Sequence, residues 1–172
     1  MNSAKNFLFA LLVSWLSMSL LVDVVAIPTV FQVMRLEGAS LLLAGRIGGA
    51  LFSKFNGLEI VLSVMTLLPG LYLWKKNLTG MKALVGITFL LIILAFSFKF
   101  YMSPQISHFA EEVARLGHDK GELYLKAFEQ RTFFHGLYKK LEGVKILLLI
   151  LSLVLIGMAQ KKESSIFGKG NL

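Results

Sequence analysis

Four apolar runs dominate the chain, and each predicts a helix long enough to cross a bilayer. A helix rises about 1.5 Å per residue, so a hydrocarbon core of about 30 Å needs about 20 apolar residues. The runs predict spans over about residues 6–27, 56–74, 82–102 and 141–160. The fourth run has only 14 residues, Ile146 to Ala159, before the polar Gln160, so charged residues must enter the membrane edge at its start. The expected fold class is all-α, a polytopic membrane protein with one domain (residues 1–160) and a polar tail (161–172).

The two longer connections lie on the side of the bundle opposite the termini. The first, residues 36–55, contains glycines at 38, 45, 48 and 49. The Gly45–Gly49 spacing permits close contact between helices, and the segment is compatible with an interfacial helix.

The second connection, about residues 103–140, is amphipathic. Its apolar residues recur at spacings of three and four up to Leu116, stop at Gly117–Gly121, and resume from Phe128. This pattern predicts that the third and fourth helices extend beyond the bilayer as an antiparallel helical hairpin.

The first run also has the features of a signal peptide. Lys5 precedes it, and Val24-Val25-Ala26 is an acceptable cleavage site. The run is longer than the usual apolar region of about 7–15 residues, so a retained helix that ends or kinks at Pro28 is the favoured interpretation.

Composition agrees with a membrane protein. Hydrophobic residues make up 56% of the chain and charged residues 16%, compared with about a quarter charged in soluble domains. The net charge of +8 does not indicate a nucleic-acid partner, because the basic residues flank the apolar runs as anchors against anionic headgroups. The absence of cysteine excludes disulfides and thiolate chemistry. We therefore expect the lipid bilayer as partner and a multi-pass location in the cell or inner membrane. The local density of basic residues favours termini in the cytoplasm, whereas their raw count favours the opposite orientation.

Several charged residues fall at one depth when about 20 residues are counted inward from the basic anchors. Asp23, Glu59, Lys99 and Lys145 then lie within about one turn of the far membrane boundary. Charges inside a membrane usually face the bundle or reach toward the headgroups. Together with charged residues of the fourth helix, they predict a polar vestibule lined by Asp23, Glu59, Lys99, Arg131, His135, Glu142 and Lys145.

Two simpler interpretations stand beside the vestibule. Lys99 and Lys145 have long apolar stems that allow their ammonium groups to reach the headgroups. Pairing between Asp23 or Glu59 and a base would also be purely structural if it only fixed the helix register.

The chain resembles the transmembrane protein 205-like family over roughly residues 7–158. The resemblance rests on Tyr101-Met102-Ser103-Pro104-Gln105-Ile106, on Arg131-Thr132-Phe133-Phe134-His135-Gly136-Leu137 and on Leu51-Phe52-Ser53-Lys54-Phe55. It implies a four-helix membrane domain in which Pro104 ends the third span and Phe134, His135 and Gly136 open the fourth. Lys139-Lys140-Leu141-Glu142-Gly143 departs from the family pattern, which often has a small residue or Asn there. The resemblance assigns no activity, because the family's activity is poorly defined.

Candidate chemistry is sparse. His108, His118 and His135 are the only histidines, and helical geometry points His108 away from His135, so we expect no metal site and no cofactor. Hydrolase motifs are absent, so we expect no enzyme.

Two functions remain open. The first is a non-enzymatic accessory or scaffold component that meets a membrane-protein partner or a second copy. The second is small-solute, proton or metal-ion handling through the vestibule, with His135 as the titrating centre and Asp23 and Glu59 as cation-facing carboxylates.

Overall fold

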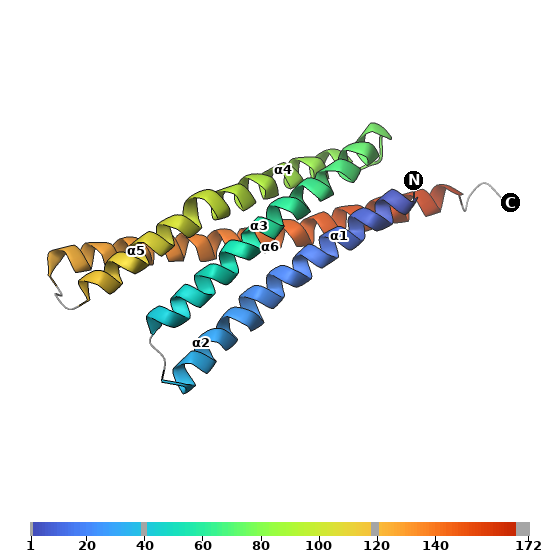
Figure 1. Cartoon of the computed structure of the whole chain (residues 1–172). Helices are drawn as coiled ribbons and strands as arrows, with labels where there is room; N and C mark the ends of the chain where they lie inside the picture. Colours follow the sequence, from blue (N-terminus) through green and yellow to red (C-terminus); the bar gives the residue numbers. More distant parts are fainter. Residues whose placement is uncertain (1, 39–40, 118–120, 168–172) are drawn as a thin grey trace.

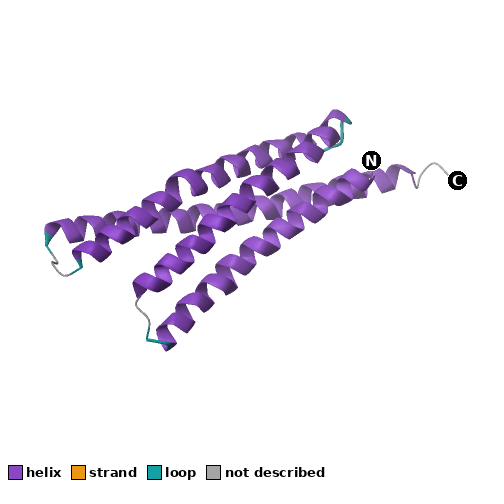
Figure 2. Cartoon of the chain, viewed as in Figure 1, coloured by secondary structure: helices purple, strands orange, loops and turns teal. Residues whose placement is uncertain are grey.

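The computed structural model describes residues 2–38, 41–117 and 121–167, and the elements in these ranges are helices without strands (Figure 2). The all-α prediction is therefore confirmed. Residues 168–172 of the predicted polar tail, and His118, lie outside the described residues.

The first transmembrane candidate is one long rod in three parts. It consists of α1 (Asn2–Leu20), the π-helix η1 (Leu21–Ala26) and α2 (Ile27–Leu36). Pro28 stands in the first turn of α2 and does not end the rod. A proline lacks an N–H group and collides with the preceding turn, and the wider π-helical turn before it relieves this conflict.

The second helix, α3 (Leu41–Lys75), begins about four turns before the predicted span. The expectation of a separate interfacial helix at residues 36–55 is wrong, because most of that segment is the start of α3. The predicted close contact at Gly45 and Gly49 is not seen within the chain: a Cβ atom on Gly45 would face open space, and one on Gly49 would lie at an ordinary contact distance of 3.9 Å from Ser107. A Cβ atom on Gly48 would likewise make an ordinary contact of 3.5 Å with Phe31 of α2.

The third and fourth helices also exceed their predicted spans. The third rod comprises α4 (Met81–Ser97), the π-helix η2 (Phe98–Met102) and α5 (Ser103–Leu116), and the last helix is α6 (Glu122–Phe167). Pro104 lies in the first turn of α5 and, like Pro28, directly follows a π-helix without ending the rod.

The helices run alternately up and down, with both termini and the α3–α4 turn at one end (Figure 1). We call this the terminal end. Around the bundle, α1 packs on α3 and α6, while α4 packs on α3 and α6. At the opposite end, which we call the loop end, α2 lies against α3, and α5 lies against both α6 and α3. Toward the loop end, the pair formed by α2 and α3 diverges from the pair formed by α5 and α6 (Figure 1).

Two apolar cores hold the bundle. The larger, toward the terminal end, includes the fully buried Leu12, Leu84 and Leu149 from three different helices. The smaller, toward the loop end, is centred on Phe98, Met102 and Tyr138. A polar region lies between these two cores.

Four helices are long and apolar enough to cross a membrane: Asn2–Leu36, Leu43–Lys75, Met81–Leu116 and Glu122–Ala159. Their outward faces carry large exposed apolar side chains, such as Leu68, Ile93 and Leu147. An apolar surface of this kind fits a lipid environment.

Candidate functional site: a buried carboxyl cluster

Glu59 of α3 lies at the centre of the polar region, and its side chain is completely buried. The indole Nε1 of Trp15 donates a hydrogen bond of 2.9 Å to Glu59 Oε1, and Ser19 Oγ lies 3.4 Å from the same oxygen. Both donors belong to α1, one turn apart. Glu59 therefore joins α3 to α1 through neutral hydrogen-bond donors.

Lys145 of α6 supplies the positive charge. Its ammonium group donates hydrogen bonds to Oε1 of Glu59 and to Oε1 of Glu142, and its side chain is also completely buried. The rings of Phe55 and Phe98 lie with their centroids 5.4 and 5.7 Å from Nζ, within the range of cation–π attraction. The alternative that Lys145 reaches the headgroups is therefore wrong: its ammonium group is held in the interior.

Asp23 completes the cluster from η1. Its half-buried carboxyl group interacts electrostatically with Lys145 and Glu59 and lies near Glu142, which is 7% exposed. We call Asp23, Glu59, Glu142 and Lys145 the carboxyl cluster.

The carboxyl cluster contains more acid than base. Three carboxyl groups surround one ammonium group, so full ionisation would leave two negative charges uncompensated within the cluster. One oxygen of each acid, Asp23 Oδ2, Glu59 Oε2 and Glu142 Oε2, is buried and has no hydrogen-bond partner among the described residues. Burying such atoms is costly, and native structures contain few of them. The cluster therefore has an unused capacity to bind a positive charge.

A neutral polar network continues from the cluster toward the loop end. Tyr138 donates a hydrogen bond of 3.1 Å to Asn56 Oδ1, and Asn56 Nδ2 donates one of 2.9 Å to Ser103 Oγ. Tyr138 lies one turn before Glu142 on α6, and Asn56 lies one turn before Glu59 on α3. Beside this network, Lys99 Nζ donates to the carbonyl oxygen of Ser53 at 2.7 Å and to its hydroxyl at 2.9 Å.

The terminal side of the cluster differs. Ser63, Thr66 and Ser152 are buried there, and each hydroxyl donates a hydrogen bond to a carbonyl oxygen three or four residues earlier in its own helix. Leu12, Leu149 and other members of the larger core surround them. The polar connections of the cluster thus lead toward the loop end.

Both π-helices lie at the depth of the polar region. Asp23 is in η1 and Lys99 is in η2, and each stands five positions before a proline, Pro28 or Pro104. Single π-helical turns are often found at functional sites, because they re-aim a side chain within a helix. Here they occur on the two helices that run in the same direction from the terminal end.

The structure unites only part of the predicted vestibule. Asp23, Glu59, Glu142 and Lys145 meet, while Lys99 binds Ser53 nearby. Arg131 and His135 do not join them: they precede Glu142 on α6 by 11 and 7 residues, about 16 and 10 Å along the axis. His135 is exposed and lies one helical turn from both Arg131 and Lys139 on α6. Its position does not support the prediction of His135 as the titrating centre.

The residues of the family resemblance lie at the base of the hairpin. Phe134 packs between Phe109 and Tyr101, with ring centroids 5.8 and 6.0 Å away. Pro104 is exposed in α5, and Gly136 is half-buried with open space at its Cβ position. Phe134 therefore helps to join η2 and α5 to α6.

No group of three His, Cys, Asp or Glu side chains within the described ranges is placed to hold a metal ion. His108 is 62% exposed and lies 3.8 Å from Glu112 on the surface of α5.

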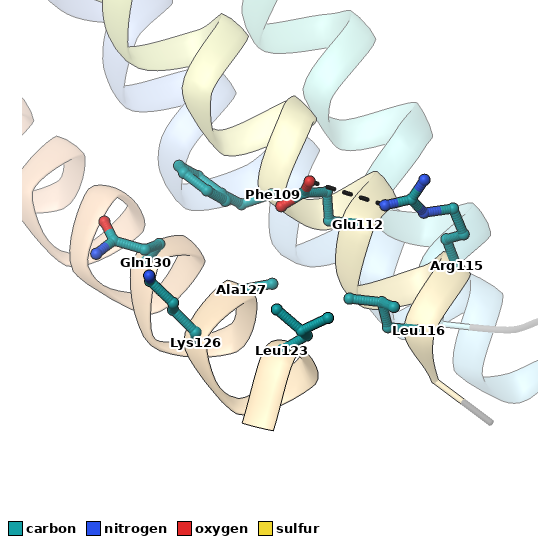
Figure 3. Close-up of a pocket in the computed structure, with 8 residues that line it drawn as sticks. All are labelled: Phe109, Glu112, Arg115, Leu116, Leu123, Lys126, Ala127 and Gln130. Atoms are coloured by element: carbon teal, nitrogen blue, oxygen red, sulfur yellow. Dashed lines mark ion pairs between the residues drawn. The ribbon is translucent and has the colours of Figure 1, made fainter. Parts of the chain in front are cut away.

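A shallow groove lies near the tip of the hairpin, between α5 and α6 (Figure 3). Glu112 and Arg115 form an ion pair of 4.0 Å at its edge. The lining residues are Phe109, Glu112, Arg115 and Leu116 from α5, and Leu123, Lys126, Ala127 and Gln130 from α6. The groove is separate from the carboxyl cluster.

Several members of the polar region were not predicted as site residues, among them Trp15, Asn56 and Tyr138. Their spacing contains a usable signal. Trp15 and Ser19 precede Asp23 by eight and four residues, and Asn56 precedes Glu59 by three, so each shares a helix face with a charged residue.

Comparisons of the chain with models of protein families, with curated proteins and with solved structures gave no match.

Proposed function

We propose that this chain is an integral membrane protein that binds a small cation at the carboxyl cluster. The observation that supports this most directly is the excess of buried carboxyl groups, three acids around Lys145, each with one unpartnered oxygen. A cluster that served only to fix helix register would be better stabilised by equal numbers of acids and bases. The geometry therefore favours cation handling over the purely structural role of an accessory or scaffold component.

The proposed membrane position follows from aromatic residues at the ends of the apolar surface. Tyr72 and Trp74 are exposed near the terminal end, and Phe100 and Tyr101 are exposed on η2. Lys82 and Tyr101 are 19 positions apart, about 28 Å along the third rod. Aromatic residues concentrate at both membrane interfaces, so this separation matches one hydrocarbon core.

In this position the carboxyl cluster lies just inside one face of the membrane. The hairpin formed by α5 and the start of α6 projects from that face. A cation from the loop side would meet the polar network of Tyr138, Asn56 and Ser103 before the cluster.

We also propose, on the resemblance of the sequence, that the fold is that of the transmembrane protein 205-like family. A membrane-protein partner or a second copy of the chain is a further proposal.

Cation flux through purified protein in liposomes tests this function. Gradients of protons, Na⁺ or K⁺ are imposed separately, and flux is followed with ion-sensitive dyes. We expect a flux above that of empty liposomes for at least one cation. Glu59→Gln should reduce it by more than about tenfold, the factor that corresponds to 1.4 kcal/mol.

Glu129→Gln is the matched control, because Glu129 is exposed on the hairpin and lies far from the cluster. It should leave the flux unchanged. Wild-type protein that is correctly folded but passes no cation under any gradient would contradict the proposed function.

A further inference from the structure

We infer that a seam between α3 and the rod of η2 and α5 binds the phosphate group of an anionic lipid. We call it the hydroxyl seam, and its residues are Gly49, Ser53 and Gly57 on α3 and Lys99, Ser103 and Ser107 on η2 and α5. The inference uses the membrane position proposed above, but it does not depend on cation binding at the carboxyl cluster. Three features support it: the register of the two helices, their unused hydrogen-bond donors, and an unpaired positive charge.

The hydroxyl seam arises where two antiparallel helices face each other with small and polar residues. On each side the three residues are four positions apart, so they lie along one face of their helix. A Cβ atom on Gly49 would lie 3.9 Å from Ser107 Oγ, and one on Gly57 would lie 4.0 Å from Lys99 Nζ. Between these two levels, Lys99 Nζ donates to the carbonyl oxygen of Ser53 at 2.7 Å and to its hydroxyl at 2.9 Å. The ammonium group therefore extends from the level of Gly57 toward the loop end.

The serine hydroxyls of the seam have donor capacity left over. A hydroxyl group inside a helix often donates to a carbonyl oxygen one turn earlier, as that of Thr66 does. Within the described ranges, the hydroxyls of Ser53, Ser103 and Ser107 donate to no acceptor. Ser103 Oγ instead accepts a hydrogen bond of 2.9 Å from Asn56 Nδ2. Each of these three hydroxyls can therefore donate to an acceptor from outside the chain.

Lys99 supplies a positive charge that no acid of the described residues neutralises in an ion pair. An ammonium group has three N–H donors, and Ser53 uses two of them, so one is left for another acceptor. Farther toward the loop end, the exposed Arg46 on α3 and the exposed Glu111 on α5 carry opposite charges and leave this balance unchanged. The seam thus offers donors and one positive charge, which suit an anion with several oxygen atoms. Lysine is a common ligand of phosphate for this reason.

The depth of the seam favours a lipid as the source of the phosphate. Phe100 and Tyr101, which follow Lys99, are exposed, as aromatic residues at a membrane interface are. The seam is half-buried at Ser53 and exposed at Ser107, so it opens on the outside of the bundle. Lipid phosphate groups lie just outside the hydrocarbon core, and anionic headgroups are attracted to basic residues there.

Native mass spectrometry of the full chain in mild detergent tests the inference. The chain is titrated with short-chain phosphatidic acid, whose phosphate monoester exposes several oxygen atoms. Phosphatidylcholine is the comparison, because Lys99 would repel its quaternary ammonium group. We expect saturable binding of phosphatidic acid by the wild type and weaker binding of phosphatidylcholine. Lys99→Met should weaken the binding of phosphatidic acid by more than about tenfold, since a hydrogen bond between charged groups is lost.

Two further variants separate binding from folding. Lys99→Met also removes the hydrogen bonds to Ser53, whereas Lys99→Arg keeps the charge and the donors and should bind nearly as well as the wild type. Ser107→Asp leaves the contacts of Lys99 in place and changes an exposed position, so the chain should fold. Its negative charge lies within the seam and should repel phosphatidic acid, again weakening binding by about tenfold or more.

Lys140→Met is the matched control. It removes the same charge from an exposed lysine on α6, outside the seam. Tyr138 lies with its ring centroid 4.6 Å from that of Phe98, so Lys140 and Lys99 have nearly the same depth in the membrane. Lys140→Met should leave the binding of phosphatidic acid unchanged.

Three results would overturn the inference. Binding that survives both Lys99→Met and Ser107→Asp would place the lipid elsewhere, and equal losses in Lys99→Met and Lys140→Met would show a general attraction of charges at the interface. In a second arm, inorganic phosphate replaces the lipid. If it bound as tightly as phosphatidic acid with the same dependence on Lys99, the ligand would be free phosphate. None of these measurements involves a cation gradient, so the proposed cation function is tested separately.

Discussion

At the scale of single residues, the cost of burying Lys145 determines how the carboxyl cluster is built. An unpaired ammonium group in the interior is strongly destabilising, and pairing repays this cost only when the remaining hydrogen-bonding groups are satisfied. Lys145 has two carboxylate acceptors and two aromatic rings close to Nζ. The acids are less well satisfied, since each keeps one buried oxygen without a partner. The base is thus fixed in place, and the acids are the groups left able to change their state.

Tyr138→Phe tests the neutral network beside the cluster. The substitution leaves Asn56 Oδ1 without its donor in a buried position, and a buried unsatisfied polar atom costs about 1–3 kcal/mol. We expect a loss of this size in the free energy of unfolding, measured by denaturation in a mild detergent. Tyr101→Phe is the control, because Tyr101 is exposed and should change stability by less than about 0.5 kcal/mol. Equal effects of the two substitutions would contradict the network.

At the scale of elements, proline position and helix continuity are linked. Pro28 and Pro104 each lie in the first turn after a π-helix, and both rods continue past them. The wider turns carry Asp23 and Lys99 at the depth of the polar region. The π-helical turns therefore account both for the continuation of these helices past proline and for the placement of two charged side chains.

The α3–α4 hairpin offers a test of close packing. A Cβ atom on Gly70 would lie 3.5 Å from Leu84 and 3.6 Å from Val85, so the added methyl groups of Gly70→Val would overlap α4. Overpacking of this kind costs about 1–3 kcal/mol. We expect this loss in the free energy of unfolding.

Gly86→Val is the matched control for Gly70→Val. Its Cβ position faces open space, and it makes the same chemical change within a helix. It should destabilise the protein far less. If Gly86→Val were as destabilising as Gly70→Val, helix propensity rather than contact between α3 and α4 would explain the loss.

Much of the helical plan could be predicted, because apolar runs, basic anchors and helical rise depend on local sequence alone. Counting residues from the anchors also brought Asp23, Glu59 and Lys145 to one depth. The rotation of each helix could not be obtained in this way, since it depends on the neighbouring helices. For this reason the donors Trp15 and Asn56 were missed. Arg131 and His135 precede Glu142 by 11 and 7 residues on α6, so the structure leaves them at a different depth from the carboxyl cluster. The π-helices also escaped prediction, since a proline signals a disturbance without specifying that the helix widens.

At the scale of the whole molecule, the four candidate spans share an apolar outer surface, but the interior of the bundle differs between its two ends. The terminal half is closed by leucines, and the loop half contains the carboxyl cluster and its network. This asymmetry gives the proposed cation site access from the loop side in the conformation described, and the expected flux requires the leucine-lined half to open toward the terminal end.

Cysteine labelling tests the topology, since the natural chain contains no cysteine. Thr79 lies in the α3–α4 turn and Glu129 lies on the hairpin, and both residues are exposed. Each is replaced by a single cysteine in a separate variant. In sealed vesicles, a membrane-impermeant maleimide should reach these two positions from opposite sides. A cysteine at Val154, on the outward face of α6, should react from neither side. Reaction of the Thr79 and Glu129 positions from the same side would rule out the four-span arrangement.

The most direct test of the account is a double-mutant cycle between Glu59 and Lys145 in lipid discs. Glu59→Gln, Lys145→Met and the double variant are compared with the wild type by their free energies of unfolding. If the two side chains pair inside the bundle, their effects should deviate from additivity by more than about 1 kcal/mol, because groups in direct contact couple while distant ones add to within about 0.3–0.5 kcal/mol. Additive effects would show that these charges do not meet, and the carboxyl cluster would be disproved.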